Sequence, residues 1–298
     1  MSIVVRDNSV LCFLRREGTQ IMTDAPVVND PEVVPMSLGA RMKSYEDKME
    51  MRLDPSLPFI IRLDGHSFST FTRGFKKPFD DVISDAMIAT AGDLVQYFSA
   101  RSAFVASDEI SLVFAAIVDQ KETNAIFNGR VVKVSTLAAG YCSARFNHHL
   151  ALLCPVDHPC REKCTAGNTF FDARVFSLPS TMEVFNNIFW RSAHDTTRNS
   201  KSMFGQAVLP HKSLQNLTSN QIIEKVLAEK GLNWEDLPGH HKYGSIIKKE
   251  TFMADFTHPK TGEAIQARRH RLVTRSLRFT KWSQEEENTL MAKYWNEV

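Results

Sequence analysis

Short apolar runs alternate with amphipathic segments along the first two thirds of the chain. Residues 58–65 form an apolar run that ends in Asp64 and Gly65, which is typical of a buried strand. Residues 103–114 are apolar on both sides of an acidic centre, and they predict a β-hairpin with Ser107, Asp108 and Glu109 at its turn. Residues 174–179 predict a further strand.

The segments around these strands have helical periodicity. We expect helices over residues 37–53, 81–99, 127–149 and 183–208. The resulting order of strand, helix, hairpin, helix and strand predicts an α+β fold. Its centre would be a split βαβ antiparallel sheet with helices on one face.

The character of the chain changes after residue 208. A capped helix is expected to end at Gly231, and residues 243–252 and 269–282 alternate like the strands of a basic hairpin. We therefore predict three parts. Residues 1–35 are a flexible extension, residues 36–208 form the main domain, and residues 209–298 form a C-terminal helix and basic β-hairpin region packed on it.

Composition narrows the class of protein. The 298 residues carry a formal net charge of only +2, so a basic surface must be local. No apolar run is long enough for a membrane span. Five cysteines without a convincing secretory signal predict reduced thiols in an intracellular protein. The acids among the first twenty residues make a mitochondrial address weak, which leaves cytoplasm and mitochondrion both open.

The carboxylates at the strand ends are the main candidates for chemistry. Asp64 ends one strand, and Asp108 and Glu109 lie at a hairpin turn that is expected beside it. Acids on neighbouring strand ends can share Mg²⁺, which prefers oxygen ligands, and Gly65 allows close approach of a ligand to the backbone. The alternative is that Asp64 caps the next turn and Asp108 is a solvated hairpin tip.

Five ordered motifs resemble a known family. RLDGHSF, GFKKPFD, SDEISLVF, FDARVFSLP and WRSAHDTTRNS resemble the tRNA(His) guanylyltransferase family, and more closely its Thg1-like branch of 3′-to-5′ RNA polymerases, from about Ser37 to Phe252. The resemblance implies a nucleotidyltransferase with a polymerase-palm-like domain and a homotetramer built as a dimer of dimers. It also implies two Mg²⁺ ions held by Asp64, Asp108 and the backbone of Gly65, with Glu109 as a further catalytic acid.

The resemblance also assigns residues to the substrates, which would be ATP, GTP and other NTPs together with tRNA. The positions that match nucleotide-binding positions of the family are Gly65, His66, Ser67, Phe68, Ser69, Lys77, Asp80, Ser107, Arg130 and Lys133. Arg198 and Asn199 match the motif associated with the 5′ end of the RNA.

One departure bears on the kind of activity. Guanylyltransferases that act only on tRNA(His) carry HINNLYN where this chain has TTRNSKS, with Thr197 in the place of the histidine. The resemblance to the Thg1-like branch therefore predicts template-dependent addition of nucleotides to truncated tRNA 5′ ends. The alternatives are a dedicated tRNA(His) guanylyltransferase, and a cyclase-like palm enzyme that uses NTPs without RNA.

Two smaller patterns remain. Arg268, Arg269 and Arg271 belong to a basic stretch with interleaved aromatic residues, which is typical of RNA contact but also of an edge hairpin kept soluble by arginine. Cys154, His158, Cys160 and Cys164 fall within eleven residues. Their spacing is not that of standard zinc knuckles, so a structural zinc site and free thiols in a surface loop are both open.

Overall fold

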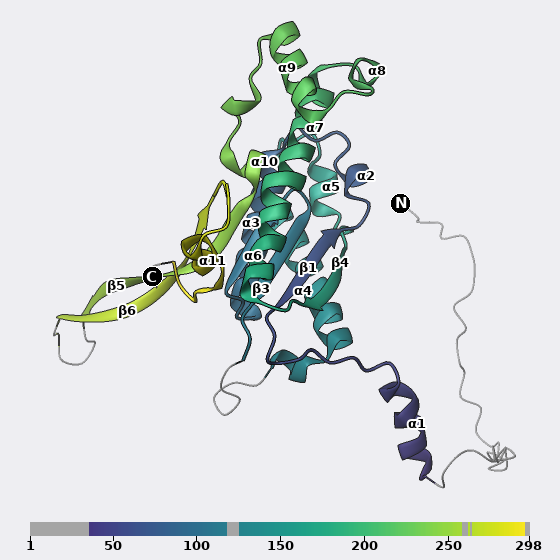
Figure 1. The fold of residues 1–298 in the computed structure, drawn as a ribbon, viewed down its shortest axis with the longest axis vertical. Coiled ribbons are helices and arrows are strands. Elements are labelled where there is room, and N and C mark those ends of the chain that lie inside the picture. The colour runs from purple at the N-terminus through teal and green to yellow at the C-terminus, as the bar shows by residue number, and fades with distance from the viewer. Residues whose placement is uncertain (1–35, 118–124, 258–261, 263, 296–298) are drawn as a thin grey trace, which may run out of the picture. The chain divides into compact units, whose positions relative to one another are not determined.

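The computed structural model describes residues 36–117, 125–257, 262 and 264–295 (Figure 1). The extension predicted for residues 1–35 lies outside the described residues. The chain divides into two compact units, Met1–Met49 and Glu50–Val298. In the first unit, helix α1 (Leu38–Asp47) is capped by Ser37, whose side chain accepts the N–H of Ala40 at 3.2 Å.

The second unit is built on one antiparallel sheet. Its described strands are β1 (Phe59–Gly65), β2 (Ser102–Ala106), β3 (Glu109–Phe114), β4 (Phe171–Ser177), β5 (Ser245–Thr257) and β6 (Ala264–Arg275), in the spatial order β4-β1-β3-β2-β5-β6. The first four strands form the predicted split βαβ arrangement. The α+β class expected from the sequence is confirmed.

The strand alternation divides the core into two layers. Ile61 and Leu63 of β1 pack with helices α3 (Asp81–Tyr97) and α4 (Val131–Leu153) on one face of the sheet. Ile60 points to the other face, because successive side chains of a strand alternate. That face carries a second helical layer, formed by α6 (Thr181–Phe189) and α11 (Gln284–Met291). The sequence pattern had predicted helices on one face of the sheet only.

The C-terminal hairpin continues the sheet. The first residues of β5 pair with β2, in the register Val105↔Ser245 and Ala103↔Ile247, and are buried. Further along, β5 pairs only with β6, and this part of the hairpin extends away from the rest of the unit (Figure 1). The domain boundary expected between residues 208 and 209 stays a prediction.

Three of the expected helices differ from the structure. The helix expected over residues 37–53 ends at Asp47, and residues 48–53 are not helical. Phe127 and Asn128 have φ values of 47° and 55° in a 3₁₀ turn (Ile126–Gly129), so α4 begins only at Val131. The helix expected over residues 183–208 contains a π-helical segment, Trp190–Thr196, between α6 and α7 (Thr197–Val208). A π segment shifts the side-chain register along a helix and is common at functional sites.

The remaining elements are short, except for one capped helix. They are α2 (Phe68–Phe71), α5 (Arg161–Thr165), α8 (His211–Leu214), α9 (Ser219–Lys230), a 3₁₀ turn (Trp234–Asp236) and α10 (Gly239–Tyr243). Helix α9 has a capping box on Thr218 and ends at Gly231 with φ 66°, as the sequence predicts. Within the described ranges, none of the helices has the length and apolar character needed to cross a membrane.

Candidate active site

The two aspartates predicted to converge do lie at one end of the sheet. β1 and β3 pair in a register that sets Asp64 opposite Glu109, and Asp108 immediately precedes Glu109 in the β2–β3 turn. The N–H of Gly65 donates to the carbonyl of Asp108 at 3.1 Å, which ties the end of β1 to the turn. Asp64 and Asp108 line the same cavity, of about 450 Å³.

Strand alternation fixes the direction of these side chains. Asp64 follows Ile60 by four residues in β1 and therefore shares its face of the sheet, the one covered by α6. The π segment after α6 brings Arg191 and Asp195 over this end of the sheet, where both line the cavity. The side chain of Asp64 thus lies at the polar end of the otherwise apolar layer between the sheet and α6.

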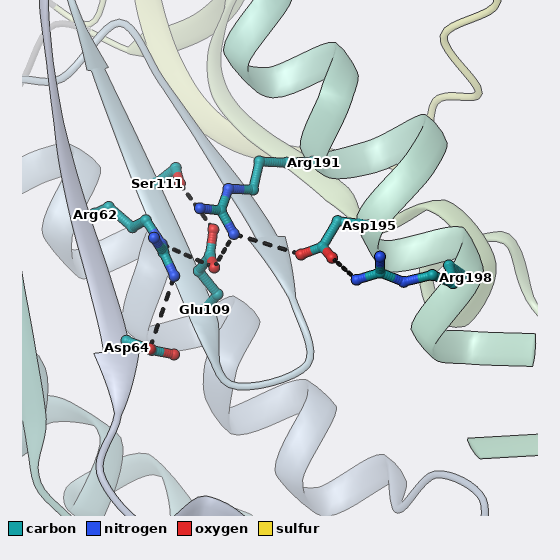
Figure 2. Close-up of polar contacts among 7 residues, drawn as sticks. All are labelled: Arg62, Asp64, Glu109, Ser111, Arg191, Asp195 and Arg198. Atoms are coloured by element: carbon teal, nitrogen blue, oxygen red, sulfur yellow. Dashed lines mark hydrogen bonds and ion pairs between the residues drawn. The ribbon is translucent and has the colours of Figure 1, made fainter. Parts of the chain in front are cut away.

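A chain of charges joins the sheet to the π segment (Figure 2). The Glu109 carboxylate lies between two guanidinium groups, with Oε2 at 2.9 Å from Arg62 Nε and at 2.9 Å from Arg191 Nη1. Arg191 Nη1 is also 3.4 Å from Asp195 Oδ2, and Asp195 Oδ1 accepts from Arg198 at 2.6 Å. Glu109 is therefore fixed by two arginines, whereas Asp64 has only a 3.8 Å contact with Arg62.

Burial shapes the protonation of two of the acids. Burial raises the pKa of Asp108, opposed by a hydrogen bond from Ser107 and reinforced by the nearby charge of Asp64. Burial also raises the pKa of Glu109, against the opposing charges of Arg191 and Arg62. The ionised form of Asp108 is therefore costly in the folded chain unless a cation accompanies it.

These features fit a divalent cation between Asp64 and Asp108. Both residues offer carboxylate oxygens, the ligands that Mg²⁺ prefers, and the charge of Asp64 disfavours ionisation of Asp108. Glycine is needed at position 65, because a Cβ there would lie 2.3 Å from the Phe68 ring. The backbone also turns unusually nearby, with Ser67 and Ser107 at φ 52° and 54°. Non-glycine residues in this conformation are often found at functional sites.

A second cavity, of about 330 Å³, adjoins the first across Ser107 and Asp108. It holds several of the residues that the sequence assigned to a nucleotide, namely Phe68, Ser69, Lys77, Asp80 and Ser107. The structure therefore brings these five together beside the aspartates.

Some of these residues are already occupied by contacts within the protein. Asp80 caps α3: its Oδ1 accepts the N–H of Val82 at 3.1 Å and its Oδ2 accepts the N–H of Lys76 at 2.9 Å. The N–H of His66 donates to the carbonyl of Phe170 at 2.8 Å. The Phe68 ring packs in the core against the rings of other phenylalanines. The nucleotide-binding roles of Asp80, His66, Ser67 and Phe68 stay predictions.

Two predicted residues lie elsewhere in the single chain. Arg130 precedes α4, forms a β-bridge with Arg52 and pairs with Glu50 at 2.7 Å. Residues 50–52 lie just before β1, so Arg130, and Lys133 one turn later in α4, lie toward the end of the sheet where β1 begins. The structure does not bring them to the cavities lined by Asp108, and their triphosphate-binding role stays a prediction.

The predicted RNA-binding residues fall in two places. Asn199 lines the cavity of Asp64, while Arg198 has a side chain that is 63% exposed. Arg268, Arg269 and Arg271 are exposed on the hairpin strand β6. Arg271 pairs with Glu250 at 2.7 Å, whereas neither Arg268 nor Arg269 has an ion pair with a described acid.

Sequence reasoning missed several residues of the cavity wall. Arg62 and Arg191 hold Glu109, and His240 and His241 of α10 line the same cavity as Asp64. The place of Arg62 could have been predicted, because a residue two positions before Asp64 in a strand lies on the same face of the sheet. The place of Arg191 could not, since it depends on the π segment.

Comparisons with known proteins agree with this geometry. A family model described as tRNAHis guanylyltransferase, Thg1, matches residues 39–179. The structure of a bacterial tRNA(His) guanylyltransferase (Thg1)-like protein in complex with ATP is 35% identical, with a TM-score of 0.64 over 71% of this chain and 88% of that chain. A second bacterial Thg1-like structure, in complex with GTP, is 29% identical, with a TM-score of 0.57 over 78% of this chain and 91% of that one.

Curated relatives point the same way. Uncharacterized protein R259 of Acanthamoeba polyphaga mimivirus is 35% identical over 77% of this chain and 80% of its own length. The tRNA(His) guanylyltransferase of Saccharomyces cerevisiae is 27% identical over 66% of this chain and 84% of its own.

The fold and the family make this chain a nucleotidyltransferase of the kind that adds nucleotides to the 5′ end of tRNA. It belongs to the tRNA(His) guanylyltransferase family, as the resemblance implied.

The raised pKa of Asp108 leads to a stability prediction. In the metal-free protein, Asp108→Asn is expected to raise Tm by about 2–4 °C at pH 7.5. A carboxyl whose folded pKa is raised stabilises the fold while protonated, and this contribution is lost as the pH rises through the folded pKa. The measurement is thermal unfolding in EDTA at several pH values. The gain should vanish at pH 4, and an equal gain at pH 4 and pH 7.5 would show that the buried charge of Asp108 is not its cause.

Proposed function

We propose that this protein extends tRNA 5′ ends in the 3′-to-5′ direction, using the opposite strand of the tRNA as template. The observation that carries the proposal is that Asp64 and Asp108 line one cavity, and that Asp108 also lines the adjoining one. One cavity has the basic loop around Lys77, which suits a triphosphate, and the other has Asn199, which suits an RNA end. The substrates proposed are NTPs, with ATP or GTP also serving for activation.

The chemistry has two transfers. In activation, an oxygen of the tRNA 5′-monophosphate attacks the α-phosphorus of ATP, a P–O bond forms, and pyrophosphate leaves. In the second step, nucleotide addition, the 3′-hydroxyl of the incoming NTP loses its proton and attacks the activated 5′-phosphorus, and AMP leaves. A 5′-triphosphate end needs no activation.

The side chains in the cavities have separate roles in this proposal. Asp64, Asp108 and the carbonyl of Gly65 would hold two Mg²⁺ ions, which when bound neutralise the charge that builds on the transferred phosphoryl group. Lys77 orients a triphosphate as a point charge. Glu109 has a supporting role: its carboxylate pairs with Arg62 and Arg191 and so fixes the positions of these two arginines in the site.

The proposal of templated repair depends on the segment after the π helix. Thr197 replaces the family histidine, and its hydroxyl donates to the carbonyls of Ser192 at 3.1 Å and Lys242 at 3.3 Å. A short hydroxyl group tied to the main chain offers no side chain to read one particular RNA end. This supports relaxed choice among tRNAs.

The basic hairpin is the proposed site for the body of the tRNA. Arg269 stacks over Phe256 at 4.8 Å and Arg268 over Tyr294 at 5.9 Å, so exposed cations are held by aromatic rings. Such groups can contact phosphates and unstacked bases. Glu250 offsets the charge of Arg271, which makes Arg268 and Arg269 the stronger candidates. The homotetramer implied by the family remains part of the proposal.

One assay tests the function. Purified protein, ATP and each NTP are incubated with a 5′-monophosphorylated tRNA that lacks its first nucleotide. We expect extension by the nucleotide complementary to the opposite strand, at a rate at least about 10-fold above that for a mismatched nucleotide, because base pairing positions the 3′-hydroxyl for attack.

The controls separate the alternatives. A tRNA with a changed opposite base should change the nucleotide that is added. Addition of G alone, confined to full-length tRNA(His), would favour the dedicated guanylyltransferase and reject templated repair. Release of pyrophosphate from NTPs with no RNA labelled would reject both.

A further inference from the structure

The segment between α4 and β4 gathers sulfur and nitrogen ligands at one point. Cys154 ends α4, and Cys164 lies in α5. One sulfur from each and one ring nitrogen of His158 all lie within 4.8 Å of one another. On a tetrahedral zinc ion the thiolate sulfurs lie about 2.3 Å from the metal, and so about 3.8 Å from each other. The three groups therefore need to close by only about 1 Å.

Local hydrogen bonds pre-form this cluster. The N–H of His158 donates to the carbonyl of Pro155 at 3.1 Å, and the N–H of Cys164 donates to that of Cys160 at 3.1 Å. Arg161 donates to the carbonyl of Cys154. Two tight turns thus fold an eleven-residue segment so that its ligand-forming side chains point inward.

The ring of His158 is held at both nitrogens. Its Nε2 is 3.4 Å from Oδ2 of Asp80, and its Nδ1 accepts the N–H of Cys160 at 3.1 Å. The Nε2–H therefore faces a carboxylate, and Nδ1 can bind a metal once the N–H of Cys160 has left its lone pair. A carboxylate that holds the far nitrogen of a histidine is the usual second partner at zinc sites.

Cys160 is the candidate for a fourth ligand. It follows His158 by two positions and its thiol is buried, but its sulfur lies outside the group of three ligand atoms and must turn toward them to bind the same ion. Cys142 provides the contrast within the same protein. It is buried in α4 within the same apolar core as the other three cysteines, but among the described residues it belongs to no group of three ligands.

We propose that Cys154, His158 and Cys164 bind one structural zinc ion, and that Cys160 turns in as the fourth ligand when its N–H leaves Nδ1 of His158. Each cysteine binds as thiolate and releases its proton to solvent, while the histidine binds as the neutral ring. The set is closed, with no position for a substrate, which is typical of a structural and not a catalytic zinc site. Soft sulfur ligands separate this site from the all-oxygen site at Asp64 and Asp108.

The position of the site suggests what it stabilises. His158 packs against Phe75 with ring centroids 5.5 Å apart and bonds to Asp80, and Lys163 donates to the carbonyls of Phe71 and Arg73. Zinc would therefore fasten residues 71–80, the loop that carries Lys77 into the second cavity.

The first experiment measures zinc in the full chain, purified under reducing conditions without chelator. We expect about one zinc per chain by mass spectrometry of the metal. Cys154→Ser and Cys164→Ser should retain less than about a tenth of this, and Cys142→Ala should retain all of it. Asp64→Asn, tested in parallel, controls for zinc bound at the acidic site.

A second measurement does not depend on whether the cysteine variants fold. Adding Co²⁺ to the metal-free, reduced, unmodified protein should give the thiolate charge-transfer band and the intense visible bands of tetrahedral cobalt. Asp80→Asn should lower zinc affinity by about 10–100-fold while keeping the cap of α3. Hydrogen exchange in residues 71–80 should rise when a zinc-selective chelator is added in excess Mg²⁺.

Either of two results would overturn the proposal. The first is unmodified protein that holds less than about a tenth of a zinc per chain and shows no thiolate–cobalt band. The second is zinc content that persists in Cys154→Ser and Cys164→Ser. Neither result bears on nucleotide addition, so the zinc site and the proposed function fail independently.

Discussion

Asp64→Asn is expected to slow nucleotide addition by about 10²–10³-fold, and Asp108→Asn by a similar factor. Each change removes a charged oxygen ligand from the cavity that both residues line, and the loss of one group that stabilises developing charge has an effect of this size. The measurement is the single-turnover rate of extension of a 5′-monophosphorylated tRNA at saturating NTP.

The structure supplies the controls for this result. Asp85→Asn removes an exposed acid of α3 and should keep the rate within about twofold. Affinity for tRNA should largely persist in both active-site variants, because the proposed contacts with the body of the tRNA lie on the β5–β6 hairpin. If either Asp64→Asn or Asp108→Asn retained more than a tenth of the normal rate, the assignment of the cation site would be wrong.

Arg191→Met is expected to lower the free energy of unfolding by about 3 kcal/mol. Arg191 and Arg62 together neutralise Glu109, and all three side chains are less than a fifth exposed. Removing one partner of a buried ion pair leaves a poorly compensated charge, which typically costs about 3–5 kcal/mol. Urea unfolding at pH 7.5 measures this change.

Arg198→Met is the matched control. It removes an arginine that pairs with Asp195 at 2.6 Å, yet its side chain is 63% exposed, so its loss should cost about 0–1 kcal/mol. Adding Glu109→Gln to Arg191→Met should recover part of the stability, since the buried carboxylate is then gone and Arg62 keeps its contact with Asp64. A loss below about 0.5 kcal/mol in Arg191→Met would show that Arg62 alone neutralises Glu109.

The loss in Arg191→Met should also depend on pH. Burial already raises the pKa of Glu109, and losing Arg191 removes the largest opposing effect. A raised carboxyl pKa contributes stability while the group is protonated, and the contribution is lost as the pH rises through the folded pKa. The cost of Arg191→Met is therefore expected to be smaller at pH 5 than at pH 8.

Local patterns in the sequence were sufficient to predict the strand and the hairpin that carry the acids of the site. The apolar run before Asp64 and the acidic turn at Asp108 predict a strand and a hairpin by alternation and turn chemistry alone. The order of the elements then makes the strand and the hairpin neighbours. The pairing of Asp64 with Glu109 is what that arrangement gives.

Contacts between residues far apart in the chain could not be predicted from local sequence patterns. Arg191 reaches Glu109 across 82 positions, and it does so from a π segment that helical periodicity does not indicate. The second helical layer depends on α11, which comes from the far end of the chain. The start of α4 was misplaced because Phe127 and Asn128 adopt left-handed conformations, which are unusual for a phenylalanine and which apolar periodicity does not indicate.

The central position of β1 in the sheet limits which insertions and deletions the sequence of this enzyme can accept. β1 is held by β3 on one side and by β4 on the other, so its length is fixed from both directions. Deleting one residue between Phe59 and Leu63 would turn Asp64 into the apolar layer and Leu63 into the cavity. Insertions and deletions are thus excluded from this strand, and natural variation in chain length must be absorbed in the connections between elements.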